Sequence, residues 1–187
     1  SVASYADLET GDLGVAVIEV ESGKVIAQHG VAKSLIPAST LKTVTTASAV
    51  HFLGADYRFR TELQYDGDIT AEGTLNGNIY IKGYGDPTLA SPDMEGVLEL
   101  DELMQLFADA IAEAGIQRIN GKIVGDASYF TTAVSGDGWQ WSDLGNYYGT
   151  GAWGLTIHEN LFYLHFQQTS RLRATPKITG TTPYVPN

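Results

Sequence analysis

The sequence predicts an α+β protein. Its first part contains two short segments rich in apolar residues, at 13–20 and 25–29, followed by a helical pattern that starts at residue 40. Its later part contains an amphipathic segment at 100–114 between segments of alternating polarity. Apolar residues at every third or fourth position are typical of helices, and alternation is typical of strands. A helix followed by a strand favours the α+β class.

The composition excludes several classes of partner and site. The chain has 187 residues, with 22 Asp and Glu against 11 Lys and Arg, so its formal net charge is −11. Nucleic acid is not expected as a partner, because a phosphate backbone requires a surface rich in Lys and Arg. The absence of cysteine excludes disulfides, thiolate zinc sites and a thiol nucleophile. No apolar run approaches the roughly 18–20 residues that a membrane helix needs.

The first sixty residues predict a β-hairpin followed by a helix. Residues 13–20 and 25–29 form the two strands, and Gly23 lies in the turn between them. Pro37 then holds the residue before it in an extended conformation. From residue 40 onward, apolar positions recur at helical spacing, and Gly54 is a typical helix end.

Ser39 and Lys42 form a candidate catalytic pair at the start of this helix. A serine hydroxyl becomes a nucleophile when a neighbouring base takes its proton. An uncharged lysine amine one turn away is such a base where burial or nearby positive charge lowers its pKa. This is the Ser-x-x-Lys motif of acyl-transferring enzymes. The motif alone also fits a helix-capping serine followed by a solvated lysine, so it leaves both interpretations open.

The remaining two thirds predict a second α+β region. The expected helix ends at Gly115 and buries one apolar face. The strand after it is interrupted at Asn120-Gly121, and the tail from residue 175 forms an extended connector or an edge strand. The expected strands are at 59–65, 73–82, 116–124 and 160–167, the last with both faces buried or half-buried.

Three polar residues in this region are weighed as site residues and rejected. Asp86 lies in a Gly- and Pro-containing loop, where a carboxylate more often forms a turn than takes part in catalysis. His158 and His165 lack the His-Glu-x-x-His spacing of zinc enzymes. We therefore predict no metal site and no cofactor.

Five aromatic residues gather in a Gly-rich stretch between 139 and 153. Such rings either stack on sugars or peptides, or pin a loop over the core. The second interpretation is preferred on the sequence. The residues are Trp139, Trp141, Tyr147, Tyr148 and Trp153.

Six segments of the chain carry a family resemblance. Residues 37–42, with the sequence PASTLK, and residues 53–61 come first. The others are 77–89, 121–126, 138–143 and 155–160. Together, and in this order, they resemble the D-alanyl-D-alanine carboxypeptidase/endopeptidase family, the class C low-molecular-mass penicillin-binding proteins. The combination is far more specific than Ser-x-x-Lys alone.

The resemblance implies a transpeptidase-like domain of the penicillin-binding and serine β-lactamase type. Residues 1–62 would be its N-terminal part, and residues 63–187 an incomplete inserted α+β domain. The family consists of bacterial cell-wall enzymes outside the cytoplasm, most often in the periplasm, and the chain as given has no signal peptide. Ser39 would attack the penultimate D-alanine of a peptidoglycan stem peptide, with Lys42 as its base. β-Lactam antibiotics would acylate the same serine.

Two motifs of the family do not occur in these 187 residues: Ser-x-Asn and Lys-Thr-Gly. We therefore expect an N-terminal portion that is inactive alone and exposes the apolar faces of its hairpin and first helix. The C-terminal portion would be a separate chain of a nicked enzyme or would have been removed. Two alternatives remain, a non-catalytic peptidoglycan-binding module and a serine β-lactamase. The inserted-domain segments between 80 and 160 disfavour the β-lactamase.

Overall fold

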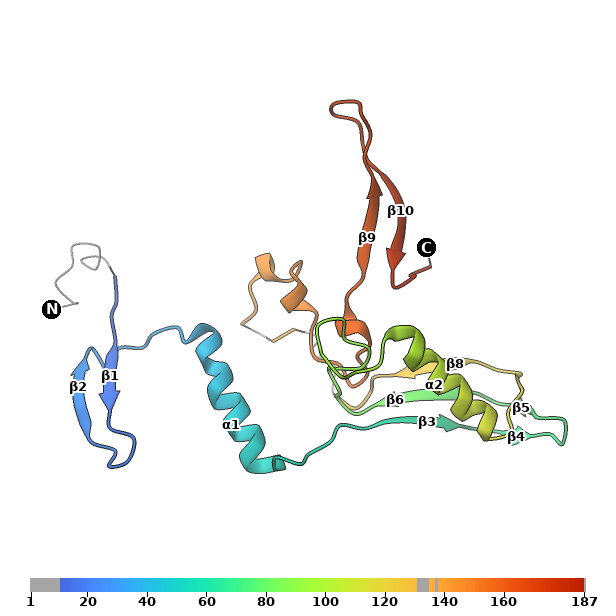
Figure 1. The fold of residues 1–187 in the computed structure, drawn as a ribbon, viewed down its shortest axis with the longest axis horizontal. Helices are drawn as coiled ribbons and strands as arrows, with labels where there is room; N and C mark the ends of the chain where they lie inside the picture. Colours follow the sequence, from blue (N-terminus) through green and yellow to red (C-terminus); the bar gives the residue numbers. More distant parts are fainter. Residues whose placement is uncertain (1–10, 131–134, 137, 187) are drawn as a thin grey trace. The chain divides into compact units, whose positions relative to one another are not determined.

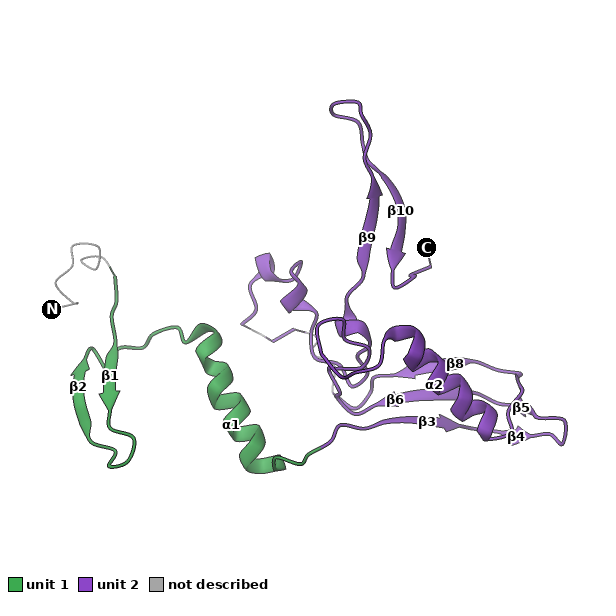
Figure 2. Cartoon of the chain, viewed as in Figure 1, with its two compact units in different colours: residues 1–57 green, residues 58–187 purple. Residues whose placement is uncertain are grey.

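The computed structural model describes residues 11–130, 135–136 and 138–186. The chain divides into two compact units, residues 1–57 and 58–187 (Figure 1, Figure 2). The boundary expected between residues 62 and 63 falls inside a strand of the second unit, and the assignment of units to family domains stays a prediction. None of the helices within the described ranges combines the length and the apolar character needed to cross a bilayer.

The first unit contains the predicted hairpin. Strands β1 (Val15–Ile18) and β2 (Val25–His29) pair antiparallel, with Val15 opposite His29. The turn between them is closed by two backbone hydrogen bonds, in which the N–H of Glu19 donates to the carbonyl of Lys24 at 2.8 Å and that of Gly23 to Glu19 at 2.9 Å. Both strands are exposed along their whole length.

The predicted helix follows as α1 (Leu41–Leu53), and a backbone N–H of Gly54 donates to the Val50 carbonyl at 3.0 Å where the helix ends. This helix buries none of its residues. Val44 is 61% exposed and Phe52 is 81% exposed, although both belong to the apolar face. The exposed faces of the hairpin and the helix agree with the expectation that this segment does not form a core by itself.

The second unit is built on two three-stranded sheets, and each sheet combines an antiparallel pair with a parallel pair. The larger sheet has β6 at its centre, and the smaller has β5. Their strand orders are β3 (Thr61–Tyr65), β6 (Ile79–Gly83), β8 (Ile123–Asp126) and β4 (Asp68–Ile69), β5 (Thr74–Asn76), β7 (Arg118–Ile119).

The prediction of a single strand at 73–82 is wrong, because the chain forms two strands there, β5 and β6, which belong to different sheets. The break lies at Gly77, where the backbone passes Gly121 in the link between β7 and β8. A Cβ at Gly121 would lie 1.8 Å from the Gly77 carbonyl oxygen, and a Cβ at Gly77 would lie 2.0 Å from that of Asp66. The two glycines thus allow three backbone segments to cross at one point, where the chain changes from the smaller sheet to the larger.

Helix α2 (Leu100–Glu113) agrees with the prediction, and it lies along the larger sheet (Figure 1). The Glu102 carboxylate accepts a hydrogen bond from the backbone N–H of Glu99 at 3.0 Å, which satisfies a donor at the N-terminus of the helix. The core is formed by three buried residues and the apolar residues packed against them. They are Leu75, Ile79 and Ile116, with Leu63, Ile69, Ile111 and Ile119 around them.

The C-terminal hairpin consists of β9 (Tyr163–Gln167) and β10 (Lys177–Thr182), paired antiparallel. The tail thus forms an edge strand, one of the two alternatives that the sequence predicts. The expected burial of the strand at 160–167 is wrong, because all five residues of β9 are exposed. Alternating apolar residues on both faces predict two packing partners, whereas each of these strands has one neighbouring strand in its sheet.

Asp66 fixes the crossing of the backbone segments. Its carboxylate accepts hydrogen bonds from the Tyr80 hydroxyl at 2.7 Å and from the Asn78 backbone N–H at 2.6 Å. The Asn78 side chain in turn accepts one from the backbone N–H of Lys122 at 3.0 Å. The Tyr80 hydroxyl, followed by the Asn78 N–H, lowers the pKa of the Asp66 carboxyl, because each of these hydrogen bonds favours the charged form.

We predict that Leu75→Ala lowers the free energy of unfolding of the second unit by about 2–5 kcal/mol, the range for a buried leucine that leaves a cavity. Leu75 is 0% exposed and lies at the centre of the core. The measurement is urea unfolding followed by tryptophan fluorescence, which reports on this unit because all three tryptophans lie in it. Leu106→Ala, at a position 52% exposed on α2, is the matched control and should have little effect. Equal losses in the two variants would contradict the assigned core.

We also predict that Asp66 makes the second unit sensitive to acid. Its folded pKa is lowered. The carboxylate therefore stabilises the fold fully above its unfolded pKa of about 3.9. This stabilisation is lost as the pH falls through the lower folded value. The urea midpoint of the native chain should thus decrease from pH 5 toward pH 2 more than that of Asp66→Asn. Asp68→Asn, which leaves the Asp66 network intact, should keep the native pH profile, and a profile unchanged in Asp66→Asn would refute the assignment.

Candidate active site

The candidate nucleophile lies in a tight turn that leads into α1. A 3-10 helix at Ala38–Thr40 follows Pro37, and its hydrogen bonds join the N–H of Thr40 to the Pro37 carbonyl and the N–H of Leu41 to the Ala38 carbonyl. Ala38 has φ 44°, a left-handed conformation that costs a residue with a Cβ about 1–3 kcal/mol. Such outliers cluster at functional sites, and this one immediately precedes Ser39.

Ser39 and Lys42 are in direct contact. The Lys42 Nζ donates a hydrogen bond to the Ser39 Oγ, with 3.0 Å between the two atoms. The helical spacing of three residues brings the two side chains to the same face. When the amine is uncharged, the same contact lets the hydroxyl donate and the nitrogen accept, which is the first requirement for general base catalysis.

The geometry argues against Ser39 as a simple helix cap. Thr40, rather than Ser39, is the N-cap residue of α1, and its hydroxyl donates to the Pro37 carbonyl. The N-cap residue makes no side-chain hydrogen bond to the start of α1, and the hydrogen bond found for the Ser39 hydroxyl is the one from Lys42 rather than from a helix N–H. The Ser39 hydroxyl is thus available to the Lys42 amine, and the side chains of Ser39 and Lys42 are both exposed to water. Catalytic roles for Ser39 and Lys42 stay predictions at this point.

Asp86 forms the turn that the sequence predicts. Its carboxylate oxygen Oδ1 accepts hydrogen bonds from the Thr88 backbone N–H at 2.8 Å and from the Thr88 hydroxyl at 2.7 Å. These two bonds close the loop onto itself, as a turn-forming aspartate does. The carboxylate is thus engaged in local structure.

The aromatic stretch differs from the preferred expectation. Two of the five rings lie largely in solvent, because Trp141 is 89% exposed and Tyr147 is 73% exposed, whereas Trp139 is 43% and Trp153 is 38% exposed. Two short 3-10 helices, Trp141–Asp143 and Tyr147–Gly149, carry these residues. The preferred interpretation, a loop pinned over the core, is therefore not confirmed for Trp141 and Tyr147, and contact with a ligand stays the alternative.

The histidines considered as metal ligands are engaged in other contacts. The His158 Nδ1 lies 3.1 Å from the Leu161 carbonyl oxygen, and the His165 Nε2 lies 2.8 Å from the Thr182 hydroxyl. Within residues 11–130 and the described part beyond, the structure has no group of three His, Asp or Glu side chains placed to hold a metal ion.

The chain matches a known family along nearly its whole length. The model of the family described as D-Ala-D-Ala carboxypeptidase 3 (S13) covers residues 1–184. The chain belongs to the D-Ala-D-Ala carboxypeptidase 3 (S13) family. This confirms the predicted family.

Two relatives illustrate how much of an S13 protein the chain represents. It is 30% identical to the D-alanyl-D-alanine carboxypeptidase DacB of Haemophilus influenzae over a 173-residue alignment that covers 87% of this chain and 34% of that protein. It is 28% identical to a D-alanyl-D-alanine carboxypeptidase of Actinomadura sp. over 150 residues, or 80% of this chain and 26% of that protein. The chain thus spans about a third or less of the length of these S13 relatives.

Solved structures confirm the fold class. The crystal structure of penicillin binding protein 4 (dacB) from H. influenzae matches 92% of this chain and 35% of its own, with a TM-score of 0.74 and 30% identity. A second structure of that protein, complexed with a novel β-lactam, matches 65% of this chain and 26% of its own, with a TM-score of 0.50 and 31% identity. The α+β fold of this S13 chain is thus that of the matching part of a penicillin-binding protein.

Proposed function

We propose that this chain is the N-terminal portion of a serine-type D-Ala-D-Ala carboxypeptidase/endopeptidase that acts on peptidoglycan stem peptides. Family membership supports the reaction class. The observation that carries the proposal is the 3.0 Å contact between the Lys42 Nζ and the Ser39 Oγ. We also propose β-lactams as acylating ligands, because a relative with the same fold has been crystallised with one, and an extracytoplasmic location, because the proposed substrate lies there.

The proposed reaction uses the two side chains in sequence. The Ser39 Oγ attacks the carbonyl carbon of the penultimate D-alanine while its proton passes to the Lys42 amine. The C–N bond then breaks, the proton is transferred to the departing amine of the terminal D-alanine, and an ester to Ser39 remains. Water hydrolyses this ester, with the same amine as general base. The Ser39 backbone N–H would be one of the two donors that stabilise the oxyanion.

The proposal includes a further segment that completes the site. A lysine amine accepts a proton only when it is uncharged, and this form is favoured where water is excluded or positive charge is near. Helix α1 buries none of its residues, so residues 11–57 do not exclude water from the pair. Ser-x-Asn and Lys-Thr-Gly are absent from the 187 residues. We therefore propose that the complete protein supplies these motifs and covers α1.

We expect a fluorescent penicillin to label the complete protein covalently at Ser39 and Ser39→Ala to lose the label. Trypsin releases residues 34–42 as one peptide, because Lys33 and Lys42 flank it. Mass spectrometry should find the penicilloyl group on this peptide. Ser48→Ala, which changes a second serine of α1, is the matched control and should be labelled normally.

Two outcomes of this experiment would contradict the proposal. A label that persists in Ser39→Ala would remove Ser39 from the mechanism. A label on the isolated 187-residue chain would show that no further segment is needed to complete the site.

We expect Lys42→Arg to slow acylation by at least about a hundredfold, the contribution of a positioned general base. Arginine keeps the positive charge and much of the length of lysine but is not deprotonated in proteins. The test therefore separates a base from a merely electrostatic group. Stopped-flow acylation rates measure the effect, with Lys24→Arg in the turn of the first hairpin as control. A Lys42→Arg rate within about threefold of the native rate would exclude Lys42 as the base.

A further inference from the structure

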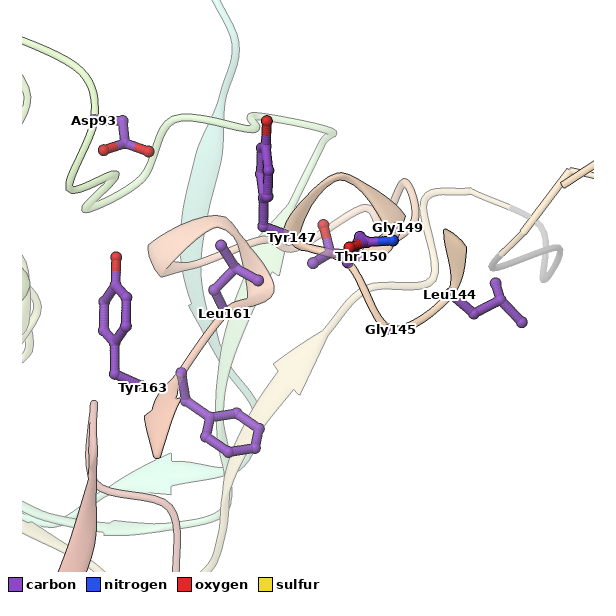
Figure 3. Close-up of a pocket in the computed structure, with 10 residues that line it drawn as sticks. Asp93, Leu144, Gly145, Tyr147, Gly149, Thr150, Leu161 and Tyr163 are labelled. Carbon is purple, nitrogen blue, oxygen red and sulfur yellow. The ribbon is translucent and has the colours of Figure 1, made fainter. Parts of the chain in front are cut away.

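The second unit has a pocket of about 660 Å³, and all the residues that line it belong to this unit. Its walls come from three segments: the loop containing Asp93, the aromatic stretch at 144–150, and residues 161–163 at the start of β9 (Figure 3). Its size is within the usual range of sites for small organic ligands.

The lining combines aromatic rings with a few polar groups. Tyr147, Phe162 and Tyr163 supply three rings, each more than half exposed to solvent. Asp93 supplies a carboxylate and Asn146 an amide. In the view of Figure 3, the hydroxyls of Tyr147 and Tyr163 point in the same direction, toward the end where the Asp93 carboxylate lies. Exposed rings grouped in one hollow are typical of a binding surface.

The wall formed by β9 is held in place by buried groups. His158 is 8% exposed, and its ring meets the Tyr163 ring edge to face, with 6.0 Å between the centroids. The His158 backbone N–H donates to the Leu89 carbonyl at 2.8 Å. This bond ties the start of β9 to the loop that carries Asp93.

A second tie joins the same two segments. Ser91 is 6% exposed, and its hydroxyl donates to the Glu159 carboxylate while accepting the Asp93 backbone N–H at 3.3 Å. The turn that contains Glu159 is left-handed over three consecutive residues, with φ between 52° and 57°. Residues with a Cβ rarely adopt this conformation, and it persists only where the surroundings enforce it. These contacts tie the backbone at Asp93 and the ring of Tyr163 to the same two buried residues, Ser91 and His158.

The charge of the lining indicates the chemistry of the ligand. The ten described residues that line the pocket include one carboxylate and no Lys, Arg or His. The free carboxylate of a D-alanyl peptide or a phosphate would find no cation there. A ligand amine would gain little binding free energy from an ion pair with a single exposed carboxylate. A neutral ligand with flat apolar faces and many hydroxyl and amide groups matches the rings, the Asp93 acceptor and the Asn146 amide together.

We propose that this pocket binds a neutral oligosaccharide of N-acetylated amino sugars, the chemistry of a peptidoglycan glycan strand. Sugar rings would stack on Tyr147 and Tyr163, and their hydroxyl and acetamido N–H groups would donate to Asp93. The preference for a neutral, polyhydroxylated ligand rests on the pocket alone. The choice of an amino-sugar polymer rests on the proposed function. Such a site would hold the wall independently of the reaction at Ser39.

The test is calorimetric titration of the 187-residue chain with chitotetraose, a β-1,4-linked tetramer of N-acetylglucosamine. We expect saturable binding, weakened at least about tenfold by Tyr147→Ala, which corresponds to about 1.4 kcal/mol. Asp93→Asn should weaken it as well. Tyr184→Ala is the matched control, because Tyr184 is 82% exposed and does not line the pocket. Unchanged circular dichroism of each variant would show that the fold is retained.

Three results would overturn the inference: no binding of chitotetraose to the native chain, equal binding by native chain and Tyr147→Ala, or a stem tripeptide that binds in place of the sugar and is lost in Tyr147→Ala. The outcome is separable from that of the proposed function. Ser39→Ala should bind chitotetraose normally. Penicillin labelling of the complete protein should persist in Tyr147→Ala, so either proposal can fail alone.

Discussion

The contact between the Lys42 amine and the Ser39 hydroxyl is the interaction on which the functional interpretation depends, and its origin is local. One 3-10 turn followed by the first turn of α1 brings the two atoms to 3.0 Å. No residue from outside this segment is needed for that distance. The chemistry has a different requirement, because a lysine acts as a base only where its surroundings favour the uncharged form. The geometry is thus supplied by this segment, whereas the proposed reactivity requires surroundings that the segment does not provide.

The elements that could be predicted from the sequence are those whose signal lies within one segment. The first hairpin, α1 and α2 each follow from periodicity and from turn or end residues. The prediction of one strand at 73–82 was wrong because the alternation of apolar and polar residues continues through Gly77. The break there comes from Gly121, which is 44 residues further along the chain and approaches the Gly77 carbonyl. A contact between distant backbone segments leaves no periodic trace in either of them.

The same distinction holds for the sites. Ser39 and Lys42 are three residues apart, and so their contact could be predicted from helical spacing. The pocket of the second unit joins Asp93, Tyr147 and Tyr163, which are too far apart for any spacing rule. The aromatic stretch is evident in the sequence, but aromatic residues are usually buried for their large apolar area. Trp141 and Tyr147, on the short 3-10 helices, are instead largely exposed, which hydrophobicity alone could not indicate.

The left-handed turn at residues 158–160 has a mechanical consequence for the second unit. The Ser91 hydroxyl is hydrogen-bonded to Glu159 within that turn, and this bond stabilises a backbone conformation that is otherwise unfavourable. If this hydrogen bond broke, the turn would lose that support, while the backbone hydrogen bond from His158 to the Leu89 carbonyl would still tie the base of the C-terminal hairpin to the loop beside it. The buried Ser91 hydroxyl and the Leu89 carbonyl thus together fix the point from which β9 leaves the body of the unit.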